Sequence, residues 1–182
     1  MRKISLALAM IAASFAVNAQ KTSERANAFK VNLFSPLVKT GSFFYERKLN
    51  EKSTAQLGFG FTSYTPDDVS LKGIFLTPEY RFYLSGEAMN GFYVGPYVRY
   101  QNLKLEDKTP GSEGKATLNT FGGGLVVGRQ WLFSDRITLD IFAGPNYSAG
   151  DVKVKSGDDN FDVPGTFKGF GVRTGVTLGI AF

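Results

Sequence analysis

The segment spanning residues 169–182 alternates between bulky, mostly apolar residues and small or polar ones. The bulky positions are Phe170, Val172, Thr174, Val176, Leu178, Ile180 and Phe182. Four of the seven intervening positions are glycine. A repeat of two residues places these two sets on opposite faces of an extended strand. The segment is therefore expected to be a β-strand with one large apolar face and one small face.

The same period of two recurs along the chain, between clusters of Gly, Asn, Asp, Ser and Pro and with few signs of helix. Eight segments are predicted to be strands, at residues 28–37, 41–49, 54–64, 72–84, 91–104, 116–131, 136–149 and 166–182. An even number of antiparallel strands is typical of bacterial membrane barrels. The predicted fold class is all-β, an eight-stranded antiparallel up-and-down transmembrane β-barrel.

The residues on the face opposite the bulky side chains distinguish a membrane barrel from a soluble barrel. A soluble sandwich or lipocalin-like barrel turns its bulky side chains inward and covers its outside with charge. Here the face opposite the bulky side chains carries glycine, threonine, tyrosine and a few ions. Such a face suits the interior of a narrow barrel, so the bulky face is expected to contact lipid.

A targeting signal precedes the strands. Arg2 and Lys3 are followed by an apolar run at residues 4–17 and by the small-residue site Val17-Asn18-Ala19. This pattern predicts a signal peptide at residues 1–19, cleaved after Ala19, and an outer-membrane β-barrel domain at residues 20–182. The alternative is a retained anchor, although the run is short for a transmembrane helix. The small, scattered net charge does not indicate nucleic-acid binding.

The lengths of the connections predict an orientation. The longer connections fall near residues 65–71, 105–115 and 150–165. Outer-membrane barrels have short periplasmic turns and longer outer loops. We therefore expect the protein in the bacterial outer membrane, with its N-terminus periplasmic and its longer loops extracellular.

Together these features resemble the OmpA/OmpX-type family of small outer-membrane barrels. The alternating end of the chain is similar to the signal by which such proteins are recognised by the barrel-assembly machinery. That signal comprises Val176, Leu178, Ile180 and Phe182. The run at residues 122–131 and the segment Phe142-Ala143-Gly144-Pro145 also resemble an outer-membrane barrel family of Bacteroidota. The resemblance implies an integral outer-membrane protein and names no activity.

The chain contains no cysteine and no histidine. Their absence excludes thiolate metal sites, a cysteine nucleophile, a disulfide framework, the Ser-His-Asp triad and histidine-based zinc sites. An outer-membrane acyltransferase, deacylase or protease would be a third class of function, but such enzymes rely on a catalytic histidine that this chain lacks. We expect no catalytic residue, no cofactor and no metal site.

Six charged residues fall on the small face of the predicted strands. They are Glu46, Glu79, Arg81, Arg99, Asp140 and Arg173. The interior of an eight-stranded barrel is just wide enough for side chains to fill it, so three acids and three bases are expected to pair and seal the lumen. The alternatives are a gated ion path and a catalytic pair of carboxylates.

Four prolines lie within predicted strands, where each removes a hydrogen-bond donor. They are Pro36, Pro78, Pro96 and Pro145. A hairpin at residues 85–90 brings Pro78 nearly opposite Pro96, which predicts weakened pairing between the fourth and fifth strands. The result is either a bulge that sets curvature or a lateral gap. Such a gap resembles the gates through which some outer-membrane proteins exchange lipophilic molecules with the bilayer.

Two functions follow from these features. The first is a non-enzymatic barrel with a lumen sealed by charge, contributing to envelope integrity or surface interaction through its loops. The alternative is a transporter or receptor for a small hydrophobic ligand, with lateral exchange between strands four and five. The expected partners are outer-membrane lipid, lipopolysaccharide and, during biogenesis, the barrel-assembly machinery. We expect a monomer that binds no nucleic acid.

Overall fold

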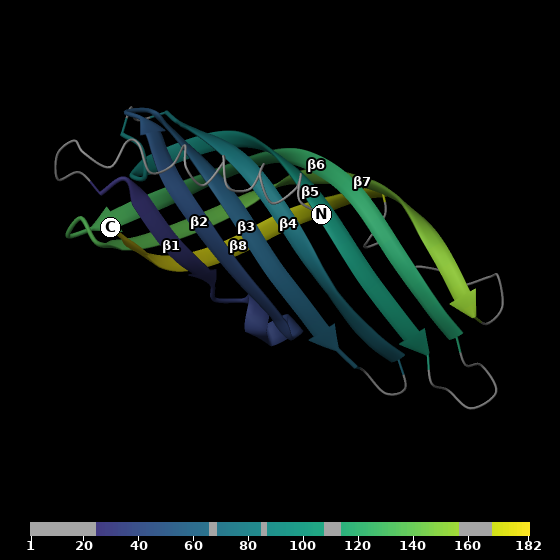
Figure 1. The fold of residues 1–182 in the computed structure, drawn as a ribbon. Coiled ribbons are helices and arrows are strands. Elements are labelled where there is room, and N and C mark those ends of the chain that lie inside the picture. Colours follow the sequence, from purple (N-terminus) through teal and green to yellow (C-terminus); the bar gives the residue numbers. More distant parts are fainter. Residues whose placement is uncertain (1–24, 66–68, 85–86, 108–113, 157–168) are drawn as a thin grey trace, which may run out of the picture.

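The computed structural model describes residues 25–65, 69–84, 87–107, 114–156 and 169–182. These residues form a closed barrel of eight antiparallel strands in sequence order (Figure 1). The strands are β1 (Asn27–Asn32), β2 (Thr40–Asn50), β3 (Ser53–Tyr64), β4 (Val69–Tyr83), β5 (Gly91–Asp107), β6 (Gly114–Phe133), β7 (Ile137–Ser156) and β8 (Gly169–Ala181). The predicted fold class is confirmed. Within the described residues, no helix is long and apolar enough to cross a membrane. The predicted signal peptide at residues 1–19 lies outside the described residues.

The barrel closes where the two terminal strands meet. Phe29 of β1 is paired with Tyr45 of β2 on one side and with Ile180 of β8 on the other. The backbone of Phe182 continues this seam, because its N–H donates to the Asn27 carbonyl and its carbonyl accepts from the Asn27 N–H. This seam pairs β1 with residues 177–181 of β8 and closes the sheet into a ring, which suits a sheet that lies in lipid.

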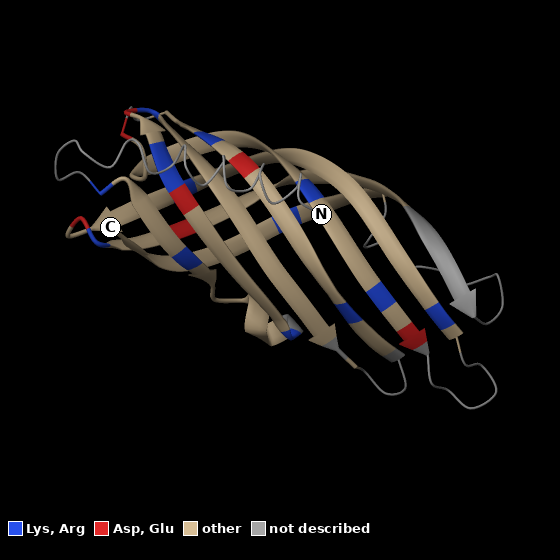
Figure 2. Cartoon of the chain, in the orientation of Figure 1, with Lys and Arg blue, Asp and Glu red and all other residues tan. Residues whose placement is uncertain are grey.

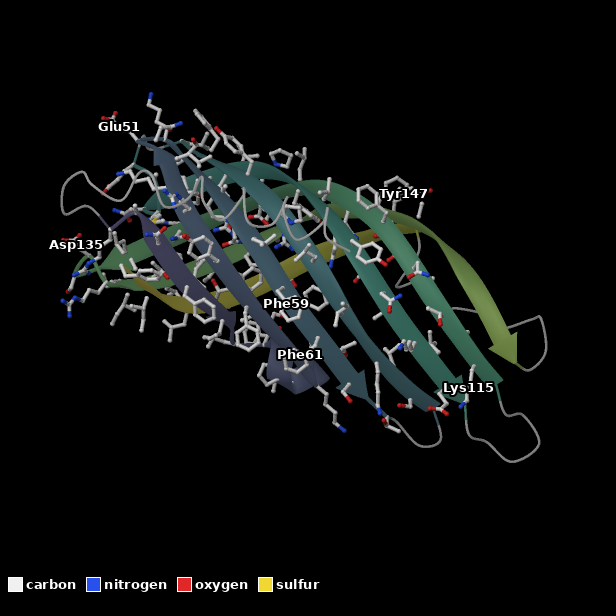
Figure 3. The ribbon with its side chains drawn as sticks, in the orientation of Figure 1. Glu51, Phe59, Phe61, Lys115, Asp135 and Tyr147 are labelled. Atoms are coloured by element: carbon white, nitrogen blue, oxygen red, sulfur yellow. The ribbon has the colours of Figure 1, made fainter. Side chains whose placement is uncertain are left out.

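Alternation along each strand sorts the side chains as the sequence predicts. Phe59 and Phe61 of β3 are 44% and 47% exposed on the outer wall, where Figure 3 labels them, whereas Gly58 and Gly60, which alternate with them, are buried. In β8, Leu178 and Ile180 face outward in the same way. The wall is therefore apolar on its outside, and its inside is lined by small and polar residues together with several buried aromatic rings.

Buried glycines make room for aromatic rings inside the barrel. A side chain at Gly60 would occupy the space of the Phe75 ring, and a side chain at Gly175 would occupy that of the Phe142 ring. Each ring belongs to a neighbouring strand and occupies the space that a side chain at the glycine would need. Small lumen residues therefore reflect packing of the interior against large neighbours.

The first strand is shorter than predicted. The strand expected at residues 28–37 ends at Asn32, whose Oδ1 accepts a hydrogen bond from the Phe34 N–H. A single turn of 3-10 helix, η1 (Ser35–Val38), then leads into β2. Pro36 lies in the first turn of η1 and not in a strand, because a residue without an N–H donor is tolerated at a helix start. The expectation that Pro36 interrupts a strand was wrong.

The strands differ in length around the barrel. β1 has 6 residues, whereas β6 and β7 have 20 each. In Figure 1, β5, β6 and β7 extend well beyond β1 at the end opposite the C-terminus. The labelled residues in Figure 3 mark the two ends, with Glu51 and Asp135 in short turns at one end and Lys115 at the other. The end near Glu51 and Asp135 is called the turn end below, and the opposite end is called the loop end.

Candidate functional site

A layer of polar side chains crosses the lumen in the half of the barrel nearer the turn end. Every strand contributes at least one member of this lumen network. The members are Lys30, Glu46, Thr54, Glu79, Arg81, Tyr83, Tyr93, Gln130, Asp140 and Arg173. Figure 2 shows acidic and basic segments on neighbouring strands in this half of the barrel.

Lys30 of β1 contacts network residues on three other strands, β2, β6 and β7. Its Nζ lies 2.7 Å from Oε2 of Glu46, 3.0 Å from Oε1 of Gln130 and 3.4 Å from Oδ2 of Asp140. The Lys30, Glu46 and Asp140 side chains have no solvent exposure. A lysine in this position uses all three of its N–H donors on buried acceptors, so its charge is compensated without water.

Arg81 of β4 occupies the centre of the network. Its Nε donates to Oε1 of Glu79 at 2.6 Å, and its Nη1 donates to Oδ2 of Asp140 at 2.8 Å. The same Nη1 lies 3.1 Å from Oε1 of Gln130. Its guanidinium carbon is 4.3 Å from the centre of the Tyr93 ring. Arg81 thus connects two carboxylates across the lumen and rests on an aromatic face.

Arg173 of β8 lies at the edge of the network that is nearer the loop end. Its Nη1 donates to Oε2 of Glu79 at 2.5 Å. Its guanidinium lies between the rings of Tyr97 and Phe142, at 4.4 and 4.8 Å from their centres. Glu79 is therefore bound on one oxygen by Arg81 and on the other by Arg173.

Hydroxyl groups donate further hydrogen bonds to the carboxylates of Glu46 and Asp140. Oε1 of Glu46 accepts from the hydroxyls of Thr54 at 2.6 Å and Tyr83 at 2.8 Å. Oδ1 of Asp140 accepts from the Tyr93 hydroxyl at 2.8 Å. Each of the three acids thus has several donors, which is what allows an ionised group to remain in a dry interior.

The turn end of the barrel is also filled. Ala88, in the described part of the connection between β4 and β5, donates its N–H to the carbonyl of Glu51 in the neighbouring turn. Met89, which is 1% exposed, packs with Ala28 and Ala181. The side chains of the network therefore have an apolar layer beneath them.

The structure brings together five of the six charged residues expected in the lumen, namely Glu46, Glu79, Arg81, Asp140 and Arg173. Arg99 is not among them, contrary to the sequence interpretation. Its guanidinium lies over the Phe75 ring at 4.1 Å, nearer the loop end, and it forms no ion pair with an acid in the described part of the chain. The third base of the network is Lys30, which the sequence interpretation missed.

A signal for Lys30 was present in the sequence. Ala28, Lys30 and Asn32 alternate with the larger apolar residues Phe29 and Val31, so Lys30 belongs to the small face of β1. The same alternation places Tyr83 on the face of Glu79 and Arg81, but it does not predict which inward hydroxyl or amide groups reach a charged partner. Among the described residues, no group of three or more Asp and Glu side chains is arranged to hold a metal ion.

Pairing between β4 and β5 is interrupted near the two prolines. Partners are recorded at Leu76 with Tyr100 and at Glu79 with Tyr97, and the ladder skips Pro78 between them. It skips Tyr80 and Arg81 as well before resuming at Phe82. This register places Pro78 opposite Val98 and Pro96 opposite Tyr80, so the prolines are two positions apart along the ladder.

A shallow apolar groove lies on the outer wall over this interruption. Its volume is about 570 Å³, and its lining includes Tyr45, Leu57, Pro78, Tyr80, Pro96 and Val98. The strands are not separated beneath it, because the Tyr80 carbonyl lies directly against the Cα of Gly95. The Leu125 carbonyl approaches Gly144, which precedes Pro145, in the same way. In both places the proline has no N–H to donate to the carbonyl of the residue opposite it. That carbonyl lies instead against the glycine that precedes the proline.

Comparison with known proteins gives one family and a shared fold. A family model described as "Protein of unknown function (DUF3575)" matches residues 5–163. No curated protein matches the chain. A major outer membrane protein from Thermus thermophilus is similar in structure, with a TM-score of 0.57 and 15% identity over 86% of this chain and 100% of that chain.

Two further solved structures are more distant. The N-terminal β-barrel domain of Pseudomonas aeruginosa OprF gives a TM-score of 0.47 and 14% identity, over 88% of this chain and 100% of that chain. Neisserial surface protein A gives 0.46 and 17%, over 86% and 94% of the two chains. The fold of this chain is that of a small eight-stranded outer-membrane barrel, as the likeness to the Thermus protein shows.

Proposed function

Because the chain belongs to the family described as "Protein of unknown function (DUF3575)", whose description names no activity, we propose a function from the barrel itself. The protein is an integral, non-enzymatic barrel of the bacterial outer membrane whose lumen is closed by the lumen network. It contributes to envelope integrity, and its extracellular loops contact other surfaces. The observation that carries this proposal is the continuous set of buried ion pairs and hydrogen bonds that joins all eight strands.

The apolar outer wall supports the location in a membrane. Large side chains such as Phe59, Phe61 and Ile74 are between 44% and 49% exposed, and they recur on every side of the barrel. An apolar belt of this extent is costly in water, whereas it is favourable in hydrocarbon. With the turn end in the periplasm, the N-terminus is periplasmic and the longer connections are extracellular.

The closed lumen follows from the size of the barrel. Wide porins leave a water channel, but in an eight-stranded barrel the side chains fill the interior. The central side chains of Lys30, Glu46 and Arg81 have no exposure to solvent. A hydrated ion that enters from the loop end meets paired charges and then the Met89 layer.

Conductance of the purified barrel in a planar lipid bilayer tests the seal. We expect no steady conductance from the unmodified protein. Arg81→Ala removes the central side chain of the network and is expected to produce a measurable conductance. Arg129→Ala is the matched control, because Arg129 lies outside the lumen beside Phe92 and Trp131 and should leave the barrel silent. Steady conductance from the unmodified barrel would contradict the proposal.

The absence of enzymatic activity is part of the proposal. In the described part of the chain, each lumen carboxylate is bound by a base, which leaves no free acid to transfer a proton. Incubation of the purified barrel with outer-membrane phospholipid and lipopolysaccharide should yield no new lipid species by mass spectrometry. Turnover of either lipid would contradict the proposal that the barrel is not an enzyme.

The proposed partners follow from the location. Lipid and lipopolysaccharide contact the outer wall, and the barrel-assembly machinery recognises the end of β8 during biogenesis. Three of its expected residues, Leu178, Ile180 and Phe182, are 42%, 64% and 59% exposed on the outside, and Val176 is half-buried beside them. The protein is proposed to act as a monomer that binds no nucleic acid.

The outer groove favours a second candidate function, a transporter or receptor for a small hydrophobic ligand. An acyl chain or a similar molecule would lie against Pro78 and Pro96 and exchange laterally with the bilayer. Uptake of a lipophilic fluorescent probe by cells with Pro78→Val and Pro96→Val should then fall. If uptake is unchanged in the double variant, the prolines are structural bulges and this function is discarded.

A further inference from the structure

A second cavity lies inside the barrel, on the loop-end side of the lumen network. Its volume is about 390 Å³. Residues from separate strands line it, among them Ser42 of β2, Phe75 of β4, Arg99 of β5 and Phe142 of β7. Arg173, which is bound to Glu79 of the network, also lines it. The cavity, called the cup below, is thus bordered on the network side by cationic groups.

Among the described residues of the lumen, Arg99 is the base without an acidic partner. Within the described chain, Lys30, Arg81 and Arg173 are paired with Glu46, Glu79 and Asp140, and Arg99 has no such acid. Its Nε is buried and has no hydrogen-bond partner. The Phe75 ring covers one face of the guanidinium at 4.1 Å and leaves its edge to the cup. Arg99 is half-buried, and a cation withdrawn from water in this way is costly unless an anion meets it.

The rest of the cup combines hydroxyls with an aromatic wall. The hydroxyls of Ser35 and Ser42 are 2.7 Å apart at one side. The rings of Phe44 and Phe142 meet edge to face, with their centres 6.5 Å apart. Leu103, which is 2% exposed, adds an aliphatic surface. A ligand that suits the cup therefore carries one anionic group and an apolar body.

We propose that the cup is a binding site for a small carboxylate with an apolar body, whose carboxylate accepts hydrogen bonds from the Arg99 guanidinium. The planar guanidinium matches the two oxygens of a carboxylate, and stacking on Phe75 holds it in a fixed plane. The apolar body packs against Phe44, Phe142 and Leu103. The site lies on the loop-end side of the network, and it does not depend on whether the network stops ions.

Calorimetric titration with 3-phenylpropionate tests the proposal. The full barrel is placed in nanodiscs of phosphatidylcholine, and empty nanodiscs correct for partition of the probe into lipid. We expect saturable binding at one site. The neutral 3-phenylpropionamide has the same apolar body and is expected to bind at least tenfold more weakly.

Variants assign the binding to Arg99. Arg99→Gln should lower the affinity for 3-phenylpropionate at least tenfold and leave that for the amide unchanged, whereas Arg99→Lys keeps the charge and should retain part of the affinity. Arg129→Gln removes an arginine from the outer wall and should change nothing. Migration of unboiled samples on a gel reports folding of each variant.

Three results would overturn the proposal. They are the absence of saturable binding to the unmodified barrel, equal binding of the acid and the amide, and unchanged binding by folded Arg99→Gln. If Arg99→Gln does not fold, the acid-to-amide ratio of the unmodified barrel decides by itself. Planar-bilayer conductance is a separate readout, so failure of the cup proposal is distinguishable from failure of the sealed-lumen proposal.

Discussion

At the scale of single residues, Lys30 tests whether the lumen network stabilises the barrel. Lys30→Met keeps a long side chain but leaves Glu46 and Asp140 with one cation fewer. Removal of one partner from a buried ion pair leaves an uncompensated charge and costs about 3–5 kcal/mol. The free energy of unfolding, measured by urea titration in micelles, should fall by this amount.

Lys115 provides the matched control for Lys30. It is paired with Glu106 at 2.8 Å, and the two side chains are 62% and 38% exposed. Water and salt screen such a pair, so Lys115→Met should cost less than about 1 kcal/mol. Equal effects of the two substitutions would show that burial of the network contributes nothing to stability.

At the scale of elements, the Gly-Pro pairs explain how prolines are tolerated inside strands. The partner carbonyl that lacks an N–H donor approaches the glycine Cα at both Gly95 and Gly144. A Cβ at Gly95 would overlap the backbone carbonyl of Tyr80, which cannot move without shifting β4. Gly95→Ala is therefore expected to destabilise the barrel by about 1–3 kcal/mol, measured by the same urea titration.

Gly171 offers a comparison on β8. The atoms nearest to a Cβ at Gly171 belong to the end of the Asn146 side chain, which can rotate away. Gly171→Ala should therefore leave the free energy of unfolding nearly unchanged. If Gly95→Ala is tolerated equally well, the close approach of the Tyr80 carbonyl does not constrain the pairing of β4 with β5.

At the scale of the whole molecule, closure of the barrel depends on the seam between β1 and β8. The backbone of Phe182 exchanges two hydrogen bonds with Asn27, at 2.8 and 3.0 Å. Its deletion removes both of these bonds and the last residue of the proposed assembly signal. We expect the deletion variant to be lost from the outer-membrane fraction and to show no difference in gel migration between boiled and unboiled samples.

Phe182→Tyr is the control for this deletion. It retains the backbone bonds and an aromatic side chain, so it should keep heat-dependent migration. A soluble periplasmic product without a heat shift, obtained from the unmodified chain, would mean that the apolar face points inward and that the membrane assignment is wrong.

Much of the fold could be predicted from the sequence because the period of two is local. The sequence of each strand shows which of its faces is bulky, as the alternation of Phe59 and Phe61 with Gly58 and Gly60 illustrates. The number of strands and the inward direction of Glu46, Glu79 and Asp140 follow from this pattern alone. The end of β1 was misplaced because the turn of 3-10 helix around Pro36 continues an apolar stretch and has no strong boundary signal.

The tertiary structure alone decided which inward residues meet. Alternation gives the face of a side chain but not its height in the barrel, which depends on the register of all eight strands. That register brings Lys30 to Glu46 and Asp140, and it places Arg99 higher, against Phe75. The sequence determined a barrel with charges inside, because side-chain direction is a local property. The pairing of those charges and the cup above them required long-range register, which no local pattern contains.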